Sequence, residues 1–187
     1  LALPRLPLTA ARAAGLWSSL SDIPAHYQRA LADELTLHTG PDSTASERPL
    51  RVAYTALHGV GEPSLRAAFA LLPKVALDSV QHQAEPDPDF PSLRFPNPEE
   101  PGTLDAVLAL ARRTGADLAL ANDPDADRLA VAAQNQRGEL QTLTGNELGA
   151  LLCDYLLMRA PQDGKNAVVT TLVSTQQIGR ASCRERV

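Results

Sequence analysis

The chain has 187 residues, of which 44% are hydrophobic and only 4% aromatic, and its formal net charge is −5. This content is enough to build a core from aliphatic side chains and alanine, while the negative charge and the lack of a Lys or Arg run argue against a nucleic-acid surface. No stretch of the sequence has the pattern of a membrane span or a signal peptide, so we expect a cytoplasmic protein with no nucleic-acid or membrane partner. Cys153 and Cys183 lack the spacing of a metal site or a disulfide. We therefore expect a reduced protein in which Cys153 is a small core residue.

The first 49 residues show helical and linker patterns. Residues 1–22 are rich in Ala, Leu and Pro, and a helix is expected over 9–20; we interpret this part as the tail of a preceding domain. Apolar residues recur at helical spacing over 26–35. The segment 23–49 is therefore predicted to be a helix followed by a polar linker.

An α/β domain is expected over residues 50–161. The apolar run 50–57 predicts a buried strand, followed by a turn and a helix that opens at Pro63, a proline that is allowed in the first helical turn. A second strand is predicted over 75–80. The segment 81–101 contains many prolines, which exclude a central strand or helix and predict a long, stiff loop of the kind that usually serves function.

The turn after the first strand, residues 58–61, reads HGVG. A glycine-rich turn between a strand and a helix can bind phosphate on helical N–H groups, but the full GxGxxG pattern is absent. We therefore expect Gly59 and Gly61 to serve the geometry of a tight turn. His58 is interpreted as a hydrogen-bonded structural residue.

A helix is predicted over residues 104–114, because apolar residues recur there at helical spacing. Thr103 is the candidate N-cap, and Gly115 lies just past the C-terminal end. The short apolar run 117–121 then predicts a strand that is covered on both faces.

The second half of the domain is predicted to contain strands over 129–133 and 139–143 and then a helix. Thr144 and Glu147 form a T-x-x-E capping box for that helix. Its expected apolar face consists of Leu148, Leu151, Leu152 and Tyr155.

Residues 162–177 are expected to begin the next domain, because the run 167–173 is apolar and β-branched. The last ten residues, 178–187, read IGRASCRERV, which back-translates into a sequence resembling a sequencing adapter. We interpret them as an artefact and exclude them from fold reasoning.

The candidate functional site is the loop after the strand at 117–121, which reads NDPDADR. Asp123, Asp125 and Asp127 crowd three negative charges into five residues at the carboxyl end of a strand, where open α/β sheets bind ligands. Hard carboxylate oxygens prefer Mg²⁺ or Ca²⁺, so a divalent metal site is the first hypothesis. Arg128 adds a fixed cation beside them.

Two structural alternatives exist for this loop. An acidic turn can simply be solvated surface. An EF-hand loop begins D-x-D-x-D but requires Gly at its sixth and Glu at its twelfth position, where this chain has Arg128 and Gln134. The EF-hand is therefore excluded.

The loop and its flanks carry a resemblance to a known family. The motifs DPDFPSLRFPNPEEPG at 87–102, NDPDADR at 122–128 and LTGNELGALL at 143–152, in this order, resemble the second of the four domains of the α-D-phosphohexomutase superfamily, the phosphoglucomutases and phosphomannomutases. The wording of DPDFP, PNPEE and TALHGVG at 55–61 is most similar to the phosphoglucomutase-2-type and phosphopentomutase-type branch.

The resemblance implies a three-layer α/β/α sandwich with a mixed sheet, and a fragment of a phosphosugar mutase. Such an enzyme moves a phosphoryl group between two hydroxyls of one sugar phosphate, through a bisphosphate intermediate and an enzyme phosphoserine. Asp123, Asp125 and Asp127 would bind Mg²⁺, and Arg128 would help to hold the phosphorylated centre. Because the family's phosphoserine, sugar-binding and phosphate-binding segments are absent here, we expect no catalytic residue other than the supporting Arg128, and an inactive fragment.

Two rival functions remain to be compared. A haloacid-dehalogenase-type phosphatase also uses aspartates and Mg²⁺, but its nucleophile motif DxDx[TV] is not matched by the residues from Asp125 to Arg128. A stand-alone divalent-metal-binding module without catalysis stays open as the alternative.

Overall fold

The structure, a computed structural model, describes residues 5–38, 48–72, 74–160 and 166–170, and its centre is a mixed five-stranded sheet. In sheet order β2-β1-β3-β4-β5, β1 is parallel to both β2 and β3, whereas β4 is antiparallel to β3 and β5. The strands are β1 (Leu50–Thr55), β2 (Val75–Ser79), β3 (Leu118–Asn122), β4 (Leu129–Gln134) and β5 (Leu140–Leu143).

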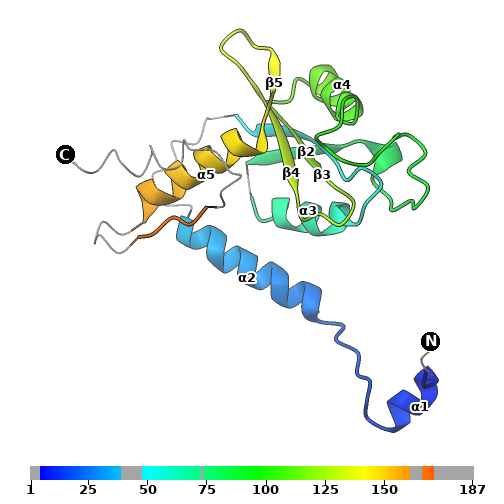
Figure 1. Cartoon of the computed structure of the whole chain (residues 1–187). Coiled ribbons are helices and arrows are strands. Elements are labelled where there is room, and N and C mark those ends of the chain that lie inside the picture. The colour runs from blue at the N-terminus through cyan, green and yellow to red at the C-terminus, as the bar shows by residue number, and fades with distance from the viewer. Residues whose placement is uncertain (1–4, 39–47, 73, 161–165, 171–187) are drawn as a thin grey trace.

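Helices cover both faces of this sheet. The α-helices are α1 (Leu8–Ala13), α2 (Ile23–His38), α3 (Gly61–Phe69), α4 (Asp105–Thr114) and α5 (Gly145–Arg159), with a short 3₁₀ turn η1 at Gln81–Gln83. The connections β1-α3-β2 and β2-α4-β3 run in opposite directions across the sheet, so right-handed crossovers place α3 and α4 on opposite faces, as Figure 1 shows. The expected α/β sandwich with a mixed sheet is confirmed.

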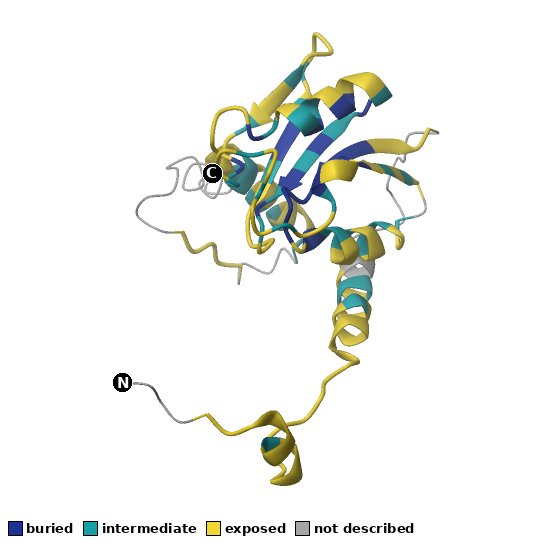
Figure 2. Ribbon diagram, turned by 90° about the vertical axis from the view of Figure 1, so that its right-hand side faces the viewer, coloured by how far each residue is buried: buried dark blue, intermediate teal, exposed yellow. Residues whose placement is uncertain are grey.

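The core lies between α4 and the central strands. Val107, Leu110 and Ala111 on the inner side of α4 pack against Ala53 of β1 and Ala119 of β3, all of them buried. Figure 2 shows these buried segments at the centre of the molecule, while α1 is exposed along most of its length. Alternation of small and branched side chains allows the helix to approach the sheet closely.

The predicted α4 is present, but its N-cap is not the one that we expected. Leu104 occupies the cap position and makes no side-chain cap bond. Thr103 is buried, and its Oγ1 donates a hydrogen bond to the carbonyl oxygen of Phe95 at 3.3 Å instead, because the preceding loop folds back onto it. At the other end, Gly115 adopts the left-handed conformation with φ 63°, as predicted.

Three further expectations need correction. The helix expected over 9–20 ends at Ala13, since Gly15 takes a positive φ of 68°. Cys153 is only partly buried. The capping box of α5 is confirmed with both of its hydrogen bonds, but the apolar face predicted for that helix is largely exposed, with Leu151 at 57% and Leu152 at 50%.

The C-terminal expectations are only partly visible. Residues 166–170 contain no strand, and the rest of the predicted strand over 167–173 lies outside the described residues, as does the segment 178–187. Within the part of the chain that the structure describes, no helix combines the length and apolar character needed to cross a membrane.

Candidate metal centre

The aspartate loop, which we define as residues 123–128, lies where the chain topology changes direction. β1 and β3 are parallel neighbours, and the connections that leave β1 and enter β3 pass over opposite faces of the sheet. The carboxyl ends of such a strand pair form the crevice in which open α/β proteins bind ligands. The loop follows β3 at this edge, next to the HGVG turn (residues 58–61) that follows β1.

Asp123 and Arg128 form the inner part of the site. Asp123 is 1% exposed, and its Oδ1 accepts a hydrogen bond from the backbone N–H of Arg128 at 2.9 Å. Its Oδ2 is contacted by Nε of Arg128 at 2.8 Å and by Nη2 at 2.7 Å. Burial acts to raise the pKa of Asp123, but the hydrogen bonds from Arg128 outweigh it and lower that pKa below the ordinary value. Asp123 is therefore a buried carboxylate that stays ionised.

Asp125 and Asp127 form the outer part of the site, and both are exposed. One carboxylate oxygen from each of Asp123, Asp125 and Asp127 can be chosen so that all three lie within 4.8 Å of one another. The negative charge of Asp125, followed by that of Asp123, raises the pKa of Asp127 above its ordinary value. One guanidinium therefore does not relieve the repulsion among three carboxylates.

The backbone of the loop is folded to bring these side chains together. The N–H of Ala126 donates to the carbonyl oxygen of Asp123 at 2.9 Å, and Ala126 has a positive φ of 61°. A non-glycine residue in this region costs of the order of 1 kcal/mol, and such strain gathers at functional sites. The strained turn points successive carboxylates to the same side of the loop.

The HGVG turn packs against the aspartate loop at Pro124. A Cβ atom on Gly59 would overlap the Cα and carbonyl oxygen of Pro124, and the N–H of Val60 donates to that same oxygen at 2.9 Å. Gly59 and Gly61 do not adopt positive φ; Leu57 and His58 do, with φ of 50° and 60°. Gly59 does close a tight turn, since its N–H donates to the carbonyl oxygen of Ala56 at 2.7 Å, and its lack of a side chain also allows the close contact with Pro124.

A hydrogen-bonded chain ties β1 to the base of the aspartate loop. The hydroxyl of Tyr54, a fully buried residue, donates to Oδ1 of Asn122 at 3.0 Å, and Nδ2 of Asn122 donates to the carbonyl oxygen of Arg128 at 2.7 Å. Burial, together with the charge of Glu62, raises the pKa of Tyr54, so its hydroxyl remains protonated as the donor. Asn122 therefore closes the loop across its two ends.

The proline-rich loop, defined as residues 84–101, is also ordered. Ser92 Oγ lies 2.8 Å from Nε2 of His58 and accepts from Nε2 of the buried Gln83 at 2.8 Å. The hydrogen bond predicted for His58 is present, and the residue is buried. At the far end of the loop, Oδ1 of Asn97 accepts from Nη1 of Arg128 at 3.0 Å. This loop thus reaches the aspartate loop directly.

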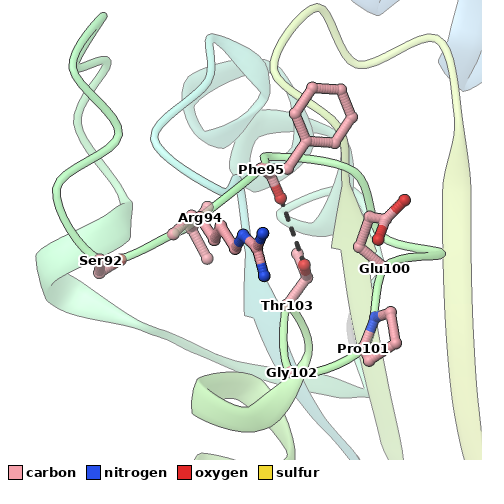
Figure 3. Close-up of a pocket in the computed structure, with 8 residues that line it drawn as sticks. Ser92, Arg94, Phe95, Glu100, Pro101, Gly102 and Thr103 are labelled. Atoms are coloured by element: carbon pink, nitrogen blue, oxygen red, sulfur yellow. Dashed lines mark hydrogen bonds between the residues drawn. The ribbon is translucent and has the colours of Figure 1, made fainter.

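A pocket of about 750 Å³ lies within the fold of the proline-rich loop. Figure 3 shows the Arg94 side chain extending between the two arms of the loop toward Thr103, while the Phe95 ring points away. The dashed line marks the bond from Thr103 to the Phe95 carbonyl oxygen, which joins the two arms. The pocket therefore has a cationic lining residue, Arg94.

The donor set of the aspartate loop fits a hard divalent cation. Three carboxylates on a preformed turn offer only oxygen ligands, which suit Mg²⁺, Ca²⁺ or Mn²⁺ better than softer metals. The raised pKa of Asp127 marks a position where added positive charge would be stabilising. Asp123, Asp125 and Asp127 are the residues that could hold such an ion.

The sequence correctly predicted that the four charged residues of the loop lie close together. It did not predict three residues that support them. Gly59 and Asn97 contact the loop from distant parts of the chain, and Tyr54 contacts Asn122 just before it. Gly59 lies in the motif TALHGVG and Asn97 in the motif PNPEE. Both motifs were recognisable in the sequence, but neither indicated a contact with the aspartate loop.

Comparison with known proteins agrees with this architecture. Residues 25–138 match the family model described as phosphoglucomutase/phosphomannomutase, alpha/beta/alpha domain II. A phosphopentomutase from Homo sapiens is 47% identical over 111 residues, which are 59% of this chain and 18% of that protein. A phosphoglucomutase from Staphylococcus aureus (strain USA300) is 34% identical over 127 residues, 68% of this chain and 23% of that protein.

The same fold is found in a solved structure. A phosphoglucomutase/phosphomannomutase family protein from Burkholderia thailandensis superimposes with a TM-score of 0.58 at 23% identity, covering 81% of this chain and 31% of that one. The chain spans about a fifth of the length of the curated relatives that it matches. The resemblance stated from the motifs is confirmed: the chain belongs to the phosphoglucomutase/phosphomannomutase family and carries its second, α/β/α domain.

Proposed function

We propose that this chain supplies the metal-binding domain of a phosphosugar mutase. In this proposal the complete enzyme is an intramolecular phosphotransferase that interconverts a sugar 1-phosphate with its 6- or 5-phosphate through a bisphosphate intermediate. Asp123, Asp125 and Asp127 hold Mg²⁺, and Arg128 supports the phosphorylated centre. The domain contributes charge and geometry, and other parts of the enzyme contribute the phosphoserine and the sugar contacts.

The observation that carries the proposal is the placement of the aspartate loop. Three clustered carboxylates and one arginine stand at the carboxyl end of β3, at the point where the sheet topology reverses. A solvated acidic turn would not need a 1% exposed aspartate, a strained Ala126 and a buried tyrosine beneath it. Backbone strain and a buried charge cost stability, and such costs are usually found at functional sites.

The roles of the residues follow from their environments. A divalent cation, when bound, supplies positive charge against the oxygens of a phosphoryl group in transfer. Asp123 stays ionised under the donors of Arg128, so it offers a permanent negative charge to a metal. Arg128 still projects part of its guanidinium to solvent, with the side chain 51% exposed, and can donate to an anionic phosphate.

The names of the relatives support two substrate classes. The human relative is a phosphopentomutase and the Staphylococcus aureus relative a phosphoglucomutase, so pentose and hexose phosphates are both candidates. The site within this chain is anionic and suited to a metal ion. We therefore infer that it affects the rate of phosphoryl transfer more than the choice of sugar.

The test is steady-state kinetics of the complete enzyme that contains this domain, with hexose and pentose 1-phosphates, comparing wild type with Asp127→Ala. Loss of one charge-stabilising ligand should lower kcat by about 10²–10³-fold and change KM little. A variant that keeps its kcat but switches its preferred sugar would contradict the proposed role of the loop.

A further inference from the structure

Arg128 is held at two ends by different loops. Nε and Nη2 face Oδ2 of Asp123 at 2.8 and 2.7 Å, and Nη1 donates to Oδ1 of Asn97 at 3.0 Å. Guanidinium is planar, so fixing both ends fixes its plane as well as its position. Asp123 is buried and Asn97 is partly buried, whereas the Arg128 side chain is half exposed between them.

A competing position for Arg128 lies close by. Its Nε is 3.7 Å from Oδ1 of Asp127, a carboxylate that lies in one cluster with those of Asp125 and Asp123. Rotation of an untethered guanidinium toward that charge would shorten this contact. The arginine would then compete with a metal ion for the exposed carboxylates.

We propose that Asn97 is a positioning residue that keeps the Arg128 guanidinium along Asp123, so that Asp125 and Asp127 remain open to a metal. The consequence for metal binding rests on the proposed function, whereas the contact between Asn97 and Arg128 does not depend on it. Asn97 is suited to the task because its amide is neutral and binds the arginine without adding a fourth negative charge to the site.

Asn97 is itself held in place by the loop around it. The same Oδ1 that accepts from Arg128 also accepts from the backbone N–H of Glu99 at 3.2 Å. Pro96 and Pro98 flank Asn97, and Pro98 is buried. A side chain oriented by its own turn between two prolines loses little conformational freedom when it binds the arginine.

Three variants separate the positioning role from a general effect on the loop. Asn97→Ser keeps an oxygen that can cap the turn at Glu99 but is too short to reach Arg128. Asn97→Asp keeps both acceptor functions. Thr103→Val is the matched control, because it removes the hydrogen bond to the Phe95 carbonyl oxygen in the same loop without touching Arg128.

Two measurements are made on the full 187-residue chain. The first is the exchange of the Arg128 side-chain Nε–H with water, followed by nuclear magnetic resonance in metal-free protein. The second is calorimetric titration with Mn²⁺. Melting temperatures of all variants establish that each one is folded before either measurement is interpreted.

We expect Asn97→Ser to accelerate exchange of the Arg128 Nε–H by about 5-fold, because loss of the hydrogen bond at Nη1 lets the guanidinium leave Asp123 more often. Its Mn²⁺ affinity should fall by about 10-fold, as is typical when a residue that orients a metal site is lost. Asn97→Asp keeps the acceptor but adds a negative charge, so it should keep the exchange of the Arg128 Nε–H near the wild-type value. Thr103→Val should leave both the exchange and the Mn²⁺ affinity unchanged, even where its melting temperature is lower.

Equal exchange and equal Mn²⁺ affinity in wild type and Asn97→Ser would overturn the inference. An equal loss in Thr103→Val would also overturn it, because the effect would then come from the loop as a whole. Absence of Mn²⁺ binding in wild type, together with faster Arg128 exchange in Asn97→Ser, would reject the metal assignment while supporting the role of Asn97 in holding Arg128.

Discussion

Replacement of Gly59 by alanine tests how the HGVG turn supports the aspartate loop. A Cβ at this position would overlap the backbone of Pro124, in the middle of the aspartate loop. The overlapped atoms belong to the backbone of Pro124, so no side-chain rotation can relieve the overlap. The two loops must separate, and the hydrogen bond from the Val60 N–H to the Pro124 carbonyl oxygen, 2.9 Å long, is then weakened or lost.

The size of the effect follows from two contributions. Forcing an additional methyl group into a packed contact typically costs about 1–3 kcal/mol. Loss of the backbone hydrogen bond between Val60 and Pro124 adds about 1 kcal/mol. The free energy of unfolding of Gly59→Ala should therefore fall by about 2–4 kcal/mol, which lowers the melting temperature of a domain of this size by about 10 °C.

The assay is thermal unfolding of the 187-residue chain followed by circular dichroism, with Gly149→Ala as the control. Gly149 lies within α5, and a Cβ added there meets no atom within 4 Å. That control should be more stable than wild type by about 0.5–1 kcal/mol, since alanine favours helix over glycine. If Gly59→Ala melts within two or three degrees of wild type, the reasoning about the contact with Pro124 is refuted.

Two further predictions concern stability. The hydrogen bond from Arg48 is the largest cause of the lowered pKa of Asp117, so Asp117 contributes stability above its unfolded pKa of about 3.9, and this contribution is lost as the pH falls through the lower folded pKa. Asp117→Asn should therefore be less stable than wild type by about 1 kcal/mol at pH 7, and the difference should be smaller at pH 3. Urea unfolding at both pH values measures this difference. A difference in stability that does not depend on pH would contradict the role of the Asp117 carboxylate. Thr144→Ala removes the side chain that accepts from the Glu147 N–H at 3.2 Å and should cost about 1 kcal/mol by urea unfolding at pH 7, whereas an unchanged midpoint would show that the capping box adds nothing.

Local signals in the sequence were sufficient for much of the fold. The apolar run before NDPDADR predicted β3 and therefore placed the three aspartates at the carboxyl edge of the sheet. The spacing of Thr144 and Glu147 predicted the start of α5, and Gly115 predicted the end of α4. Each of these signals acts over a few residues, through backbone conformation or a short-range hydrogen bond.

The predictions that failed or were missed around the site involve contacts between separate segments of the chain. Thr103 was expected to cap its own helix, but the loop that carries Phe95 supplies a closer acceptor. The contacts of Gly59 with Pro124, and of Asn97 with Arg128, join segments that only the folded sheet edge brings together. The spacing of residues in the sequence does not indicate such contacts, so the cluster of aspartates could be predicted and the residues that support it could not.

The central claim, that the aspartate loop is a divalent metal site, is tested most directly by calorimetric titration of Mg²⁺ and Mn²⁺ into the 187-residue chain. Wild type and Asp125→Ala are compared with Asp89→Ala, which removes an exposed carboxylate from the proline-rich loop outside the cluster. We expect saturable binding in wild type and Asp89→Ala and its loss in Asp125→Ala. Indistinguishable curves for wild type and Asp125→Ala would contradict it.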